Sequence, residues 1–167
     1  MTSFIEIICA YVNAIKTVNT ENPKGLKGGL DMALRILTGT HATFISESIL
    51  IQSQKIGVNP FDLIWEQRYT MGKMLINKRK YSFAVWEHTL PIREFRENLI
   101  LSKNKKEIIQ TINDYPGVAW ISREENNKLN SLGYQRKRPF GFLKCYEEAC
   151  ITLLNENMYK SIVYNKT

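Results

Sequence analysis

The chain has 167 residues, and its 23 Lys and Arg against 16 Asp and Glu give a formal net charge of +7. This length predicts one domain, or one domain with a helical annex, and 44% hydrophobic residues argue against a disordered chain or a coiled-coil rod. The three Cys form no C-x-x-C pair, so neither a disulfide framework nor a cysteine-bound zinc ion is expected. We therefore expect a reducing, cytoplasmic compartment, and the positive charge favours an acidic partner.

Residues 1–70 have the pattern of a helical region. Apolar residues at spacings of three and four predict helices over residues 4–18, 30–37 and 41–56, and a further helix that begins at Pro60. The segments Asn22-Pro23-Lys24-Gly25 and Gly28-Gly29 predict a loop between the first two helices. The first apolar run is too short to span a membrane, and no membrane partner is expected. We expect this region to serve oligomerisation or docking, through a homodimer or a partner protein.

Residues 71–167 combine short strands with helices. Strands are predicted at 74–76, 81–86 and 118–121, a polar turn at 77–80, and helices from Pro91, over 105–113, from Ser122 to Gly133 and over 143–154. Ser122-Arg123-Glu124-Glu125 is a capping box, in which the Ser hydroxyl accepts from the Glu125 amide and the Glu125 side chain returns to the Ser122 amide. The expected fold class is α+β and mostly helical, with short antiparallel strands followed by a helix.

Two segments carry side chains suited to phosphodiester hydrolysis. Glu87 and His88 stand where a hydrophobic strand ends, and Asn126 and Asn127 follow early in the capped helix. Hydrolysis needs a base to deprotonate water and a cation to stabilise the charged phosphorane. A histidine supplies the base, and carboxylate and amide oxygens are ligands that Mg²⁺ accepts beside water and phosphate.

These two segments resemble motifs of a known nuclease family. Glu87-His88-Thr89-Leu90-Pro91, and a hydrophobic strand followed by Ser122-x-x-Glu125-Asn126, are similar to the first and last motifs of HNH nucleases (His-Me finger, ββα-metal). The resemblance covers residues 73–132. It implies a small ββα-metal-like unit within residues 71–167, interrupted by a helical insertion at 92–115 and followed by a closing C-terminal helix.

The resemblance also implies roles for single residues. It makes His88 the general base, Glu87 a metal ligand and Asn126 the other ligand, with Mg²⁺ or Mn²⁺ as the cofactor. Asn127 remains an alternative to Asn126, because a step of one residue turns a helical side chain by about 100° and only one of the two can face the site.

Basic residues near these motifs are candidates for gripping phosphates. They are Lys78, Arg79 and Lys80 on the turn before the Glu87-His88 strand, and Arg136, Lys137, Arg138 and Lys144 beyond the capped helix. Contacts from Lys and Arg to phosphate give affinity without reading the base sequence. Together with the resemblance, they predict a metal-dependent endonuclease for which DNA is expected ahead of RNA, in a defence or restriction context.

Each of these features also has a structural interpretation. His88 can be a histidine at a strand end whose tautomer Glu87 fixes, and Trp65, Trp86 and Trp120 are expected in the core rather than as stacking platforms. The alternative function is a non-catalytic basic module that binds nucleic acid or inhibits a protein. A third interpretation makes residues 1–70 the active part, as an interaction domain within a larger assembly.

Overall fold

The structure is a computed structural model that describes residues 2–18 and 24–164. Its helices are α1 (Thr2–Thr17), α2 (Lys24–Leu37), α3 (Glu47–Ile56), α4 (Ile92–Leu101), α5 (Lys105–Asn113), α6 (Arg123–Ser131), α7 (Phe142–Glu148) and α8 (Glu156–Tyr164). Its strands are β1 (Phe44–Ser46), β2 (Lys73–Ile76), β3 (Arg79–Ser82), β4 (Ala84–His88), β5 (Val118–Ser122) and β6 (Leu153–Asn155). The predicted fold class, α+β and mostly helical with a helical N-terminal region, is confirmed.

A four-stranded sheet in the order β4-β5-β1-β6 forms the centre of the fold. β5 is parallel to β1 and antiparallel to β4, and β6 runs antiparallel to β1. All five residues of β5 are buried, which is expected of a strand that has a neighbour on each side and helices on both faces. β4 is one of the two edge strands, and His88 is its last residue.

Helices cover both faces of this sheet. Trp120 and Ile45 belong to a core that also contains Ile49 of α3 and Tyr159 of α8. On the opposite face, side chains of β5 pack with Leu129 of α6 and with Cys145 and Tyr146 of α7. The sheet therefore lies between two apolar layers, and side chains at alternate strand positions enter different layers.

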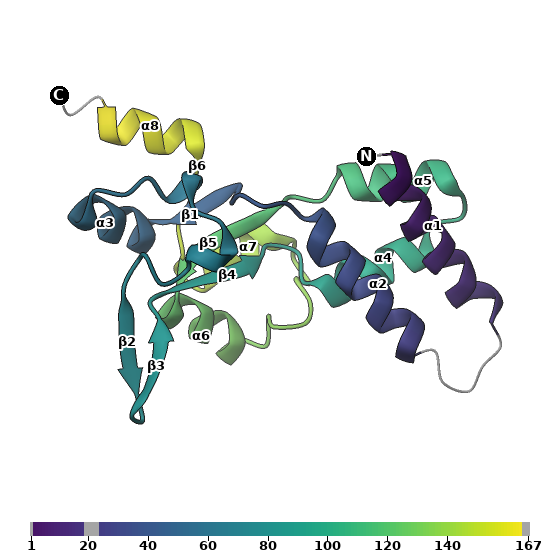
Figure 1. Ribbon diagram of the computed structural model, residues 1–167, viewed down its shortest axis with the longest axis horizontal. Coiled ribbons are helices and arrows are strands. Elements are labelled where there is room, and N and C mark those ends of the chain that lie inside the picture. The colour runs from purple at the N-terminus through teal and green to yellow at the C-terminus, as the bar shows by residue number, and fades with distance from the viewer. Residues whose placement is uncertain (1, 19–23, 165–167) are drawn as a thin grey trace.

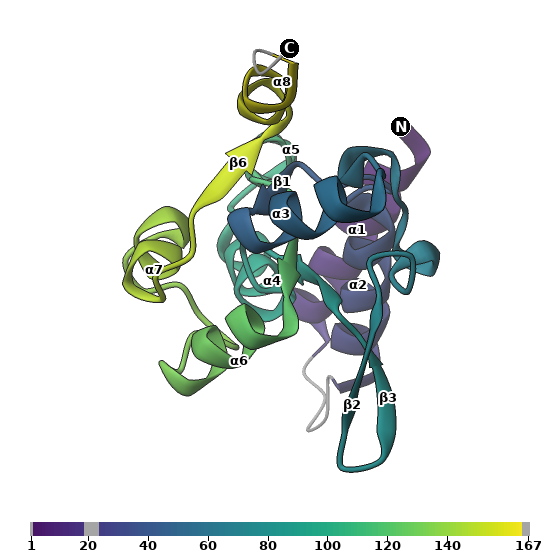
Figure 2. The same ribbon diagram turned by 90° about the vertical axis from the view of Figure 1, so that its left-hand side faces the viewer.

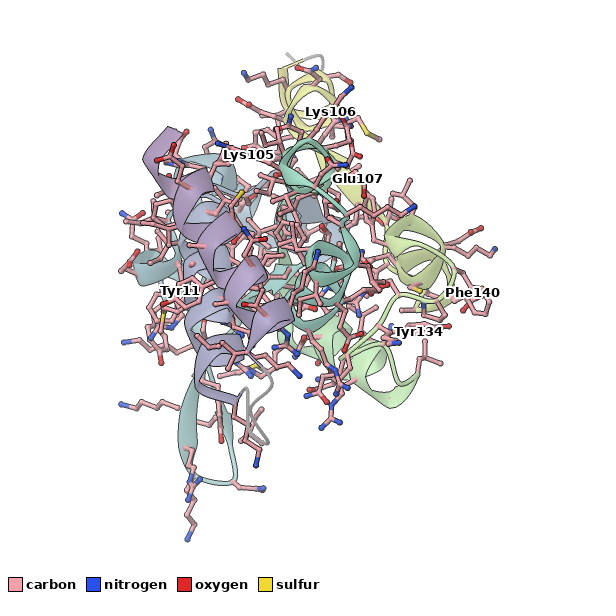
Figure 3. The ribbon with its side chains drawn as sticks, turned by 90° about the vertical axis from the view of Figure 1, so that its right-hand side faces the viewer. Tyr11, Lys105, Lys106, Glu107, Tyr134 and Phe140 are labelled. Atoms are coloured by element: carbon pink, nitrogen blue, oxygen red, sulfur yellow. The ribbon has the colours of Figure 1, made fainter. Side chains whose placement is uncertain are left out.

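A third core lies beyond the β4 edge and consists of helices alone. Side chains of α1 and α2, including Ile8 and Leu34, pack against Phe95 and Leu99 of α4 and Ile108 of α5. Figure 1 shows these four helices together on the right, and Figure 3 shows Lys105 and Lys106 on the surface at the start of α5. The apolar faces of α1 and α2, which we expected to serve docking, thus pack largely against the insertion helices. None of the helices in residues 2–18 and 24–164 has the length and apolar character needed to cross a bilayer.

The loop predicted at Gly28-Gly29 is instead part of α2. A Cβ atom on Gly29 would lie 2.7 Å from the ring of Tyr11 on α1, which is labelled in Figure 3. The absence of a side chain at Gly29 thus lets the Tyr11 ring pack closely against α2, and a larger residue would require that ring to shift. Lys24 and Gly25, also predicted to be part of the loop, are the first residues of α2, and Asn22 and Pro23 lie outside the described residues.

Three predicted helices in the rest of the chain were wrong in part. The segment 41–56 begins with β1 and becomes helical only at Glu47, and the segment 143–154 divides into α7 and β6. Both missed strands have three residues, and β1 is a central strand, so neither shows the alternation that identifies a strand. The helix predicted from Pro60 is two 3-10 turns, Pro60–Asp62 and Trp65–Gln67, because the chain is extended at Leu63 and Ile64.

The strand predicted over 81–86 is interrupted at Phe83, which divides it between two sheets. β2 and β3 form a separate two-stranded hairpin, whose turn holds Asn77 and Lys78 at φ of 50° and 65°. Both values are in the left-handed region that a two-residue hairpin turn requires. Figures 1 and 2 show this hairpin extending away from the rest of the molecule as a basic arm, which we define as residues 73–82.

The predicted capping box at the start of α6 is confirmed, and its Glu125 carboxylate has a second role. One oxygen accepts from the Ser122 amide at 2.6 Å and from the Ser46 hydroxyl at 2.6 Å, and the other accepts from the Ser48 hydroxyl at 2.8 Å. Ser46 is in turn the N-cap of α3. The buried carboxylate therefore joins the N-termini of α3 and α6, where helix dipoles favour a negative charge.

Replacing Glu125 with Gln should lower the free energy of unfolding by about 1.5–3 kcal/mol, the net value of a hydrogen bond to a charged group. The amide is isosteric, but it carries no charge and turns a donor toward the hydroxyl groups that now donate to the carboxylate. Urea unfolding followed by circular dichroism measures the change, and Glu124→Gln, on the exposed side of the same turn, is the matched control. Equal unfolding midpoints for the two variants would contradict this role.

Candidate functional site

His88 ends β4 at the edge of the sheet and is held there by Tyr115. Its Nδ1 atom lies 2.9 Å from the hydroxyl of Tyr115, in the loop between α5 and β5. Tyr115 is fixed in turn by its ring, which stacks on Phe95 of α4 with a centroid distance of 4.6 Å. Within the described residues the Nε2 atom of His88 has no hydrogen-bond partner. The insertion helices thus orient the imidazole and leave one ring nitrogen available.

The imidazole is uncharged at neutral pH. Burial, together with the smaller effect of the positive charge of Arg35, lowers the pKa of His88 from 6.5 to about 4. Burial raises the pKa of Tyr115, so its phenol keeps its proton, and the hydroxyl can donate to Nδ1 or accept from Nδ1–H. When it accepts, Nε2 is the unprotonated ring nitrogen. A neutral ring with Nε2 unprotonated is the form that a general base requires.

Glu87 is engaged by a buried arginine. Its carboxylate lies 2.8 Å from Nη2 of Arg138, whose side chain has no exposed surface, while 21% of the Glu87 side chain is exposed. Burial raises the pKa of Glu87, and the charge and hydrogen bond of Arg138 oppose that rise. Neighbouring strand residues project to opposite faces, so Glu87 turns toward the α7 layer and His88 toward the other. Glu87 is thus bound to a structural partner rather than presented as an open ligand.

Asn126 does not join Glu87 and His88. β4 and β5 are antiparallel, and His88 is paired with Val118 while Ser122, which caps α6, is paired with Ala84. The helix therefore begins ~13 Å along the strand from His88. Asn126 is half-buried and Asn127 is exposed, both in the first half of α6.

The described residues do not assemble the metal site that the resemblance implies. Among them no group of three or more His, Cys, Asp and Glu side chains is suited to hold an ion. Asp31 and Glu87 line a common hollow, but each has an oxygen in an ion pair, with Arg96 at 2.6 Å and with Arg138. Because Glu87, Asn126 and Asn127 do not converge, a Mg²⁺ or Mn²⁺ ion does not fit them as a common ligand set.

The basic residues predicted to bind nucleic acid differ from one another in exposure and in their ion-pair partners. Lys78, Arg79 and Lys80 are exposed on the basic arm, which joins β4 at Ala84, the end away from His88. Arg136 and Lys137 are exposed, Lys137 lies 3.7 Å from Glu97, and Lys144 is paired with Glu147. The assignment of Arg138 is corrected, because a guanidinium with no exposed surface cannot contact a phosphate.

Arg35 is a site residue that the sequence pattern did not reveal. It lies in the last turn of α2, is exposed, and has no ion-pair partner among the described residues. It lines two hollows, of about 500 Å³ and about 290 Å³, and His88 and Trp86 line both as well. Tyr115 was missed for the same reason, since Arg35 on α2 and Tyr115 in the loop after α5 come near His88 from distant parts of the sequence. The site therefore consists of a neutral base and an unpaired cation where two hollows meet.

Comparison with known proteins adds no family to this description. No protein-family model, curated protein or solved structure matches the chain.

Proposed function

We propose that the protein is an endonuclease that hydrolyses phosphodiester bonds, with His88 as the general base and Arg35 as the group that holds the phosphate. The observation that carries the proposal is the uncharged imidazole of His88 beside the guanidinium of Arg35, at the junction of two hollows. Neither Nε2 of His88 nor this guanidinium has a partner in residues 2–18 and 24–164. When water attacks a phosphodiester, a base must remove its proton and a cation must stabilise the charge on the phosphate. His88 and Arg35 can supply these two groups.

In the proposed reaction, Nδ1–H of His88 donates to the hydroxyl of Tyr115, and Nε2 accepts a proton from water. The resulting hydroxide attacks phosphorus, the bond from phosphorus to the leaving sugar oxygen breaks, and that oxygen takes up a proton from solvent. Arg35 stabilises the charge that grows on the non-bridging oxygens. A bound phosphate adds negative charge near the ring and raises the pKa of His88 from its value of about 4 in the free protein, which makes it a stronger base in the complex.

The resemblance to HNH nucleases implies that a divalent cation takes part as well. The roles proposed for His88 and Arg35 do not depend on it. Mg²⁺ is often held by one or two carboxylates together with the phosphate itself. The reaction requires no 2′-hydroxyl, so DNA, which the resemblance puts ahead of RNA, is a suitable substrate. Lys78, Arg79 and Lys80 on the basic arm and Arg136 and Lys137 would add contacts to the backbone.

The exposed basic arm favours a second candidate, a module that binds nucleic acid without cutting it. The two are distinguished by incubating the full chain with plasmid DNA and with single-stranded circular DNA, in Mg²⁺, in Mn²⁺ and in EDTA. Cleavage supports the endonuclease, and its loss in EDTA supports the cation. Salt-sensitive binding without cleavage under any of these conditions would contradict the endonuclease and support the binding module.

A further inference from the structure

The larger hollow beside His88 has walls suited to a flat, apolar group. It lies between the end of α2, the 3-10 turn at Trp65–Gln67 and β4, and its volume is about 500 Å³. Its apolar lining is Met32, Ile36, Ile64, Trp65 and Trp86. Met32 and Ile36 are each 62% exposed, and Trp65 is 50% exposed. Of the three Trp residues expected in the core, Trp120 is fully buried, whereas Trp65 presents its indole to this hollow.

The indole of Trp65 is held in place on the protein. The guanidinium of Arg68 lies 4.1 Å from its ring centroid, a cation–π contact that restricts the rotation of the side chain. A restrained, half-exposed aromatic ring loses little conformational freedom when another ring stacks on it. Trp65 is therefore suited to serve as a stacking platform.

Polar groups in the same hollow indicate which ring it takes. Glu66 contributes a carboxylate, an acceptor for the amino and imino N–H groups of a base. Arg35 contributes a positive charge that no acidic side chain in the described part of the chain pairs with. Arg35 also lines the smaller hollow, so a phosphate held between Arg35 and His88 lies beside the apolar walls. A hydrocarbon ligand or an apolar helix would leave both charges without partners.

We propose that this hollow binds one unpaired nucleobase of the substrate, stacked on Trp65, next to the phosphodiester that Arg35 holds in front of His88. The proposal rests on the proposed function and names its substrate class: a single strand, or a nucleotide turned out of a duplex. A base inside a duplex is covered on both faces by its neighbours and cannot enter. The charge of the site complements the nucleotide, because the base enters apolar walls while its phosphate meets the cation.

Binding of a fluorescein-labelled oligothymidylate in EDTA, measured by fluorescence anisotropy, tests this proposal independently of cleavage. Trp65→Ala should weaken binding roughly 5- to 150-fold, the effect of losing one base–aromatic stack. Trp65→Phe should keep most of the affinity, and Leu101→Ala, an exposed apolar side chain on α4, should keep all of it. The same oligonucleotide in a duplex should bind more weakly than the single strand and respond little to Trp65→Ala.

Equal affinities of wild type and Trp65→Ala for the single strand, with both proteins folded by circular dichroism, would overturn the proposal. So would a wild-type dimer that Trp65→Ala converts to a monomer without a change in DNA affinity, because a second copy would then cover the hollow. Cleavage that depends on His88 but not on Trp65 would overturn the base site alone. Trp65-dependent binding of single strands without any cleavage supports the base site while contradicting the endonuclease.

Discussion

Replacing His88 with Ala should lower the rate of DNA cleavage by about 10²–10⁴-fold, the usual contribution of a general base. The imidazole is uncharged, its Nδ1 lies 2.9 Å from the hydroxyl of Tyr115, and its Nε2 has no partner in the described part of the chain. Loss of the ring removes the proton acceptor but leaves Arg35 in place, so DNA binding should change little. Initial rates of plasmid nicking under saturating protein measure the loss.

His41→Ala is the matched control, because it is the other histidine of the chain. His41 is exposed, and its Nδ1 atom is 2.9 Å from the hydroxyl of Thr40, so its removal should change neither the fold nor the rate. Equal rates for wild type and His88→Ala, at matched folding by circular dichroism, would exclude His88 as the base.

On the acid side of the pH–rate profile, kcat/KM should fall with a midpoint near pH 4 rather than near pH 6.5. The pKa of His88 is lowered to about 4 in the free protein, so the neutral imidazole that the reaction needs is present above that pH and is lost as the pH drops through it. The profile of kcat/KM reports the free protein and is the quantity to measure. An inflection at pH 6.5 would mean that the ring is solvated, contrary to its packing.

The sequence predicted local features well and long-range ones poorly. The capping box at Ser122 and the helix over 105–113 depend on neighbouring residues, and the structure confirms both. β1 was missed because its three residues are a strand only through pairing with β5 and β6, which come from distant parts of the chain. The same limit applies to the site, where helix periodicity could place Arg35 on α2 but could not bring it to His88.

For Glu87, the partner that decides its role lies too far away in the sequence to be recognised. Its position before His88 in a short motif suggested a metal ligand, since nothing nearby in the sequence competes for the carboxylate. Arg138, its partner, is 51 residues away and follows a helix and a loop. In a basic run of residues Arg138 is indistinguishable from its exposed neighbours Arg136 and Lys137, and only the packing of α7 against the sheet identifies it as buried.

Glu87→Ala should lower the free energy of unfolding by about 3–5 kcal/mol, the cost of leaving one charge of a buried pair without its partner. The Nε and Nη1 atoms of Arg138 have no hydrogen-bond partner, so the Glu87 carboxylate is the only acidic group paired with this guanidinium in the described structure. Urea unfolding followed by circular dichroism measures the change from the shift of the midpoint at a constant slope. Glu147→Ala, which breaks the exposed pair with Lys144, is the control and should leave the midpoint unchanged.

The double variant Glu87→Leu with Arg138→Met should recover most of that loss, because apolar side chains of similar size often replace a buried ion pair without cost. The free energy of unfolding of the double variant, compared with those of Glu87→Leu alone, Arg138→Met alone and the wild type, gives the coupling energy of the pair. It also separates the two roles considered for Glu87, since the protein then folds without the carboxylate. We expect Mg²⁺-dependent cleavage to persist in this variant. A folded double variant that has lost cleavage would return Glu87 to the role of metal ligand, whereas equal stability of Glu87→Ala and wild type would contradict the buried pair itself.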